Sequence, residues 1–217
     1  MTAKLGGFWD SMLGEGRHWW ITANSDSHKH YSEGGADFWP GEYSKTYVYA
    51  EKNHDSILSA LRAGKVFVTT GDLVSELYLE VTQQNRSATI GEAITVSPGS
   101  EVTVTIRVRD PQTGNAQGEN PHVNRVDLIV GEVTGDVDDP AANSNESTRV
   151  AQRFTSSIWK GEGAYLTMSH VLSVAGSMYV RVRGSNTDEL EPEQDPPAEN
   201  PWRDLWFYSN PVFIKIR

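Results

Sequence analysis

The chain has 217 residues, seven Trp and eight Tyr, so it can bury a sizeable core as one large domain or two small ones. Its net charge of −10 disfavours a nucleic-acid backbone as partner, and no apolar run approaches the roughly 20 residues of a membrane span. The absence of cysteine excludes disulfides and thiolate metal sites. Any metal would therefore be held by histidine and carboxylate ligands, which suit zinc, manganese, iron or magnesium.

The first third of the chain reads as an α/β unit covering residues 1–72. Apolar spacing predicts a short helix at 8–13, and Asn53 or Asp55 can cap a second helix that ends before Gly64. Runs of β-branched and aromatic residues predict strands, the first of them short and buried, at 19–23, 45–50 and 65–71. The glycine-rich stretch 31–41 between the first two strands is expected to be a functional loop.

From about residue 73 the pattern changes to alternating apolar and polar residues. Turn signals separate the runs, and no helical period of useful length intervenes. We therefore predict an antiparallel β-sandwich of immunoglobulin-like or fibronectin-like type over residues 73–217, which makes the chain mostly β within an α+β class. The arginines of 178–183 should point outward. The predicted strands are 74–83, 102–109, 125–130, 148–154, 164–171, 178–183 and 212–216.

Acidic segments interrupt the sandwich at 135–147 and 187–201. Neither contains the glycine and terminal glutamate of a known calcium loop. Solvated surface loops are the preferred interpretation, and calcium binding is the weaker alternative.

The motif Asn24-Ser25-Asp26-Ser27-His28 directly follows the predicted 19–23 strand. A carboxylate and an imidazole two residues apart, just past a strand end, can both turn toward one metal ion. The alternative is structural, because Asp and Ser are common in turns and helix caps and His30 can simply be solvated.

The order of these motifs resembles the last part of the polymerase-and-histidinol-phosphatase (PHP) superfamily of metal-dependent phosphoesterases. The run 8–17 is similar to the family's W-D-x-L-L-x-x-G-x-R helix, and 25–28 to its S-D-x-H motif. Residues 60–67 look like its closing helix and strand, and 206–213 like the terminal strand of members with a C-terminal β-domain.

The resemblance implies a distorted (β/α)₇ barrel with divalent ions at the strand ends, and it makes Asp26 and His28 metal ligands. The family's N-terminal H-x-H motif and its other ligands have no counterpart here. The chain is thus expected to be a C-terminal portion, the tail of a PHP-type barrel followed by a β-domain.

The expected activity of the parent protein is hydrolysis of phosphate or related esters by metal-activated water, with zinc, manganese or iron as cofactor. Its partner would be a small-molecule ester. This chain alone should hold metal weakly or not at all and be inactive, so no catalytic residue is assigned. Arg62 and Lys65 can steer an anionic substrate, but complementing the helix dipole is the simpler role.

The alternative function is a non-catalytic module. Trp159, Trp202, Trp206 and Tyr208 can form an aromatic platform for glycan or protein, although packing between domains is the preferred interpretation. Exposed strand edges can also pair with another copy to give a homo-oligomer. The compartment is open, with a lean toward periplasmic or secreted over cytoplasmic. The substrate cannot be read from the sequence.

Overall fold

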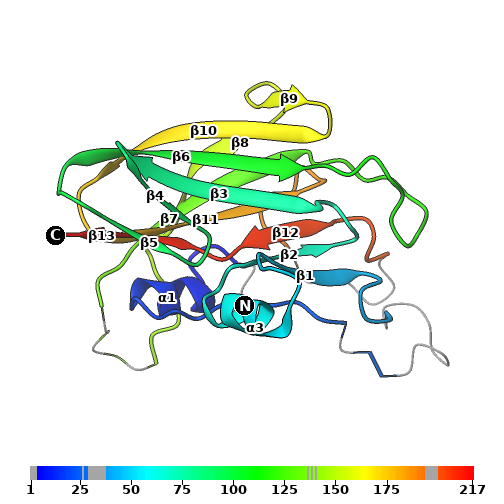
Figure 1. Ribbon diagram of the computed structural model, residues 1–217, viewed down its shortest axis with the longest axis horizontal. Helices are drawn as coiled ribbons and strands as arrows, with labels where there is room; N and C mark the ends of the chain where they lie inside the picture. The colour runs from blue at the N-terminus through cyan, green and yellow to red at the C-terminus, as the bar shows by residue number, and fades with distance from the viewer. Residues whose placement is uncertain are drawn as a thin grey trace.

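The computed structural model describes residues 4–25, 27–28, 38–135, 137, 139, 141–193 and 200–217. They form two stacked β-sheets with two short helices beside them (Figure 1). The small sheet has the order β4 (Arg86–Thr89), β3 (Glu76–Gln83), β6 (Ser100–Arg109), β10 (Tyr165–Val174) and β9 (Lys160–Glu162).

The large sheet is centred on β11 (Met178–Ser185). One edge of β11 pairs with β7 (Arg125–Glu132), which continues to β8 (Arg149–Phe154). Its other edge pairs with β12 (Trp206–Ser209) and β13 (Val212–Ile216). Beyond β12 lie β2 (Val66–Thr70) and β1 (Ser44–Val48), and beyond β13 lies β5 (Ala93–Val96) in a parallel pair.

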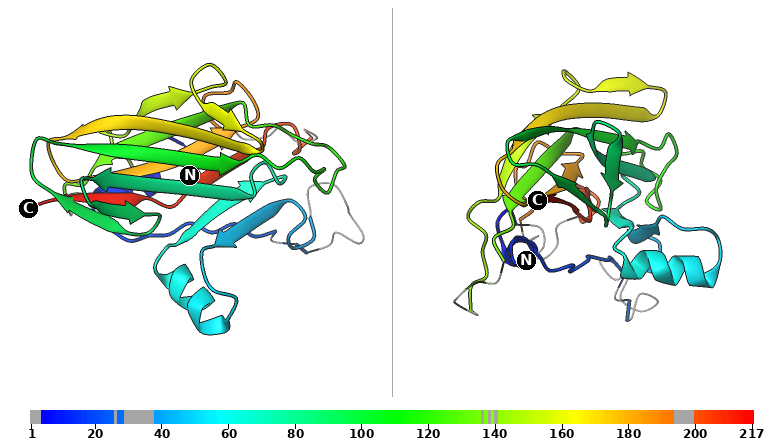
Figure 2. Two further views of the ribbon diagram at one scale, coloured as in Figure 1. Left: turned by 45° about the horizontal axis from the view of Figure 1, so that its top comes forward. Right: turned by 60° about the vertical axis from the view of Figure 1, so that its left-hand side comes forward.

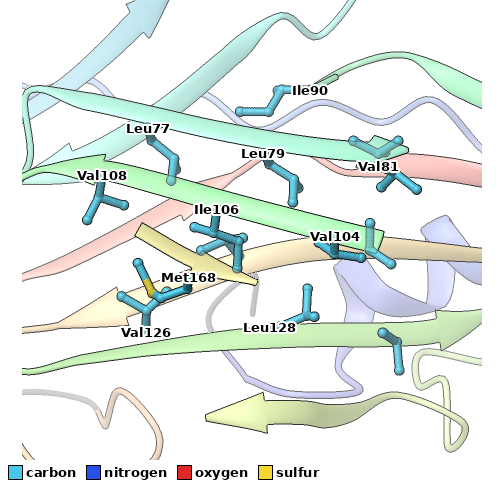
Figure 3. Packing of buried hydrophobic residues seen from close by; sticks show 14 of the residues in the cluster. Leu77, Leu79, Val81, Ile90, Val104, Ile106, Val108, Val126, Leu128 and Met168 are labelled. Carbon is cyan, nitrogen blue, oxygen red and sulfur yellow. The ribbon is translucent and has the colours of Figure 1, made fainter. Parts of the chain in front are cut away.

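The core lies between the two sheets. Alternate residues of β3 and β6 point toward Val126 and Leu128 of β7 (Figure 3). Val104, Ile106 and Val108 are fully buried, as the alternation over 102–109 predicts. Each such side chain contributes about 1.5–3 kcal/mol relative to exposure. We call this side of the large sheet its inner face and the opposite side its outer face.

Both helices lie on the outer side of the large sheet, and the further views place them on the same side (Figure 2). The helix α1 (Phe8–Gly14) packs against β7 and β11. The helix α3 (His54–Arg62) is capped by Asn53, whose side chain accepts a hydrogen bond from the Ser56 amide, and it is followed by Ala63 and by Gly64 with φ +71°. Both helices agree with the sequence prediction. Neither helix is long enough to cross a membrane.

The coarse prediction of a mostly β chain with stacked antiparallel sheets is confirmed, apart from the parallel β5–β13 pair. The expected barrel tail finds no support among the described residues. The strands β1 and β2 flank a helix but run antiparallel, whereas the repeating unit of a (β/α) barrel joins parallel strands. They form the edge of the large sheet instead, because β2 pairs with β12.

Residues on both sides of the proposed 72/73 boundary contribute to one core. Phe67 comes from β2 and Leu77 from β3, and both belong to the same buried cluster. Between them the chain reverses at Gly71 and Asp72, both with positive φ.

One local prediction is wrong. Residues 19–23 are not a buried strand: the segment lies outside both sheets, and Trp19 is 50% exposed. The arginines of β11 do point away from the core, but Arg181 and Arg183 are fully buried because the N-terminal segment and the 187–193 loop cover the outer face. The short strands β4, β5 and β9 were not predicted.

Candidate functional site

The segment that leads to the Asp26/His28 motif is fixed to the edge of the large sheet by side chains. The Thr46 hydroxyl of β1 accepts a hydrogen bond from the Ala23 amide and donates one to the Ala23 carbonyl, both at 2.8 Å. The Ser44 hydroxyl donates to the Asn24 carbonyl at 2.6 Å. A short stretch of β1 thus holds residues 23–24 by hydroxyl groups in place of a backbone ladder.

A second anchor lies two residues earlier. The Asn210 side chain, fully buried between β12 and β13, accepts from the Ile21 amide at 2.9 Å and donates to the Gly64 carbonyl at 3.2 Å. The Trp20 indole donates to the Arg62 carbonyl at 2.9 Å, and its ring lies on Gly64, where a larger residue would collide with it. The segment is therefore fixed to the sheet through its backbone and to the end of α3 through the Trp20 side chain.

His28 follows this anchored segment, and its side chain is exposed. Asp26 lies outside the described residues. Beside the segment is a cavity of about 480 Å³, lined by Asn24, Ser25 and residues 44–47 of β1. Within the described part of the chain, no group of three or more His, Asp or Glu side chains can hold a metal ion. Asp26 lies outside that part of the chain, so this result does not test the Asp26/His28 pair, which stays a prediction.

A buried ion pair lies under α1, and the sequence did not predict it. Asp10 accepts two hydrogen bonds from Arg181, from Nε at 2.8 Å and from Nη2 at 2.7 Å, and a third from the Tyr179 hydroxyl at 2.9 Å. Asp10 is 1% exposed and Arg181 is fully buried. Burial, reinforced by the Asp10 charge, raises the pKa of Tyr179 above its ordinary value. This cluster ties α1 to the centre of the large sheet.

A second charged cluster surrounds Asp127 on β7. Its carboxylate accepts from Arg153 at 2.8 Å and from Arg183 at 3.2 Å, and it lies 3.4 Å from the Arg125 Nε. Glu191 accepts a hydrogen bond from Arg183 Nη1 at 2.8 Å. The acidic 187–193 loop therefore covers part of the large sheet. This corrects the expectation that the whole loop is solvated.

The sequence held a signal for these clusters. Arginine alternates with valine in β11, and Arg125 and Asp127 alternate with apolar residues in β7. Alternation normally indicates one solvated face, so complementary charges on two adjacent strands were the only hint of burial.

A second cavity of about 480 Å³ lies between the N-terminal segment and the outer face; we call it the aromatic pocket. Its lining is uncharged and consists of Phe8, Trp9, residues 19–23, residues 68–70, Trp206 and Tyr208. No described residue is hydrogen-bonded to the Tyr208 hydroxyl, and burial raises the pKa of Tyr208 above its ordinary value.

The aromatic residues proposed as a binding platform do not share one surface. Trp202 is 7% exposed and packs edge-on against Phe38 and Tyr43, and Trp206 is 5% exposed. Trp159 packs against the core, and only Tyr208 and Trp206 border the aromatic pocket. The packing interpretation therefore fits the described side chains of Trp159 and Trp202.

The basic residues considered for substrate steering have structural neighbours. The Lys65 ammonium donates to Glu92 at 2.7 Å, and Arg62 lies in the last turn of α3, where a positive charge complements the helix dipole.

The sequence matches no protein-family model, and a search of curated proteins gives no match.

Proposed function

We propose that this chain forms part of a metal-dependent hydrolase of the PHP type, in which Asp26 and His28 are two ligands of a metal centre. The observation that carries the proposal is the S-D-x-H motif at residues 25–28, which directly follows the anchored segment 20–24. Because residues 20–24 are fixed to the sheet, the start of the motif is positioned before any metal binds, which lowers the ordering cost of binding.

The residues present do not make a complete centre. Divalent sites normally take three or four protein ligands, whereas the motif offers one carboxylate and one imidazole. A bound divalent ion would supply a water of lowered pKa as nucleophile. Ester hydrolysis is therefore proposed for a protein that contributes the remaining ligands, and no reaction step is assigned to this chain alone.

Metal titration tests the assignment. Isothermal titration of the chain with Zn²⁺ and with Mn²⁺ should show weak binding that falls at least about tenfold in His28→Ala and in Asp26→Ala. His170→Ala, a histidine on β10 in the small sheet, should leave binding unchanged. Equal affinity in wild type and both ligand variants would contradict the proposal.

Turnover tests the second half of the claim. An aryl phosphate incubated with the chain and either metal should give no hydrolysis above the metal-only rate. Turnover that disappears in Asp26→Ala and His28→Ala would show that the chain is a complete enzyme.

A further inference from the structure

The backbone of residues 20–23 is hydrogen-bonded on one side only. The peptide groups of Ile21 and Ala23 are bonded to Asn210 and Thr46. Within the described part of the chain, the N–H and C=O of Trp20 and of Thr22 have no hydrogen-bond partner, and Thr22 is exposed. In an extended chain, alternate residues direct their peptide groups to opposite sides, so Trp20 and Thr22 present their donors and acceptors on the side away from Asn210 and Thr46.

We propose that Trp20–Thr22, here called the open edge, binds an extended segment of a partner polypeptide, and that the aromatic pocket receives one apolar side chain of that segment. Unpaired strand edges are templates for an added strand, with main-chain hydrogen bonds giving affinity and pockets for alternate side chains giving specificity.

The open edge is held in shape before any partner arrives. Asn210 and Thr46 fix the segment at Ile21 and Ala23, and the Trp20 indole fixes its side chain to the end of α3. A partner therefore does not have to order this strand, which removes one of the main costs of strand addition.

The aromatic pocket adjoins the open edge, because Trp20, Ile21 and Thr22 are themselves among its lining residues. Its lining also includes Trp19, whose ring is 50% exposed and packs edge-on against Phe8. The uncharged lining selects a neutral, apolar side chain.

A sugar ring is the other ligand that aromatic walls and hydroxyl groups suit. A sugar would fill the pocket without using the alternating donors and acceptors of the open edge. A strand uses both features, and this favours the polypeptide.

Peptide titration followed by NMR tests the proposal. The probe is acetyl-Thr-Val-Phe-Val-Thr-amide, compared with the same peptide carrying Ala at the centre and with a form N-methylated at both valines. The Phe peptide should shift the Trp20 and Thr22 amide resonances and the Trp19 indole resonance. The Ala peptide and the N-methylated peptide should each bind at least about tenfold more weakly, through lost burial and lost hydrogen bonds respectively.

Protein variants separate the edge from the pocket. Thr22→Pro removes the N–H of an exposed residue and should weaken the Phe peptide about tenfold, as should Trp19→Ala. Trp39→Ala, a tryptophan of similar exposure (52%), is the matched control and should bind normally. Absence of binding, or equal binding of the N-methylated peptide, would overturn the proposal. So would glucose or cellobiose shifting the same resonances in preference to the Phe peptide, which would indicate a sugar site.

Discussion

The two faces of the large sheet are built from the same strands but held by different interactions. On β11, Val180 and Val182 face the small sheet and belong to the apolar core, while Arg181 and Arg183, which alternate with them, face α1 and the 187–193 loop. All four side chains are fully buried. Alternation along a strand therefore shows which residues share a face, and does not show what covers that face.

The two faces of the large sheet differ in how they are covered, and this bears on where a ligand can bind. The inner face is closed by interlocking apolar side chains that come from both sheets. The outer face is covered by a thin layer, residues 4–25 and the 187–193 loop, which is attached through a few charged and polar anchors. The aromatic pocket is lined in part by residues of this layer, and the S-D-x-H motif begins where residues 4–25 end.

Breaking an anchor of the outer layer should have the largest effect on stability. In Arg181→Ala the Asp10 carboxylate is left buried without its charge partner, so the free energy of unfolding should fall by about 3–5 kcal/mol. Urea denaturation followed by fluorescence measures it. The half-exposed pair Lys65–Glu92 is the control, and Lys65→Ala should cost no more than about 1 kcal/mol. Similar losses in the two variants would remove the distinction between the buried anchor and a surface ion pair.

A cavity in the inner face should lower the free energy of unfolding slightly less than the Arg181→Ala change does. Leu128 of β7 is fully buried between the sheets, and Leu128→Ala should lower the free energy of unfolding by about 2–5 kcal/mol. Val171 lies on β10 but is 54% exposed, so Val171→Ala should change stability by less than about 0.5 kcal/mol. A large loss in Val171→Ala would indicate that the outside of the small sheet is also covered.

Removing the N-terminal cap of α3 should have a smaller effect on stability than the changes within the sheets. Asn53→Ala removes the acceptor of the Ser56 amide and should cost about 1 kcal/mol, whereas Asn53→Gly should cost only a few tenths. Thermal unfolding followed by circular dichroism distinguishes them. Equal losses for Ala and Gly would show that the side-chain hydrogen bond is unimportant.

Low pH should weaken the attachment of the 187–193 loop to the large sheet. Burial alone would raise the pKa of Glu191, but hydrogen bonds from Arg183 and the Leu5 amide lower it below its ordinary value. The folded state therefore gains stability from Glu191 above the unfolded pKa of about 4.3, and this gain is lost as pH falls through the lower folded pKa. Between neutral pH and about pH 3.5, the urea midpoint should fall less in Glu191→Gln than in wild type. An identical acid dependence in the two proteins would show that Glu191 is not an anchor.

Much of the inner face was predictable from the sequence. The strand of residues 102–109 follows strict alternation, and α3 has both a cap residue and a glycine after its last turn. Each of these elements can therefore be recognised from its own residues. The layer over the outer face could not be predicted, because it is held by contacts between residues more than 100 positions apart, such as Asp10 with Arg181. The segment 19–23 was misread for the same reason: its composition suits a strand, but side chains of Thr46 and Asn210 hold it instead of a neighbouring strand.

The candidate site divides in the same way. The S-D-x-H motif and its helix could be found from sequence order, and whether Asp26 and His28 bind metal stays a prediction. The aromatic pocket could not be found, since its walls come from residues near 8, 20, 69 and 206. No local pattern brings these positions together.

The most direct test of the metal-centre proposal is paramagnetic titration of the histidine imidazole resonances with Mn²⁺. The resonances of His28 should broaden first, at metal concentrations that leave His54, His122 and His170 sharp, and this selectivity should disappear in Asp26→Ala. Uniform broadening of all histidines, or unchanged selectivity in Asp26→Ala, would contradict the assignment of Asp26 and His28 as a pair of metal ligands.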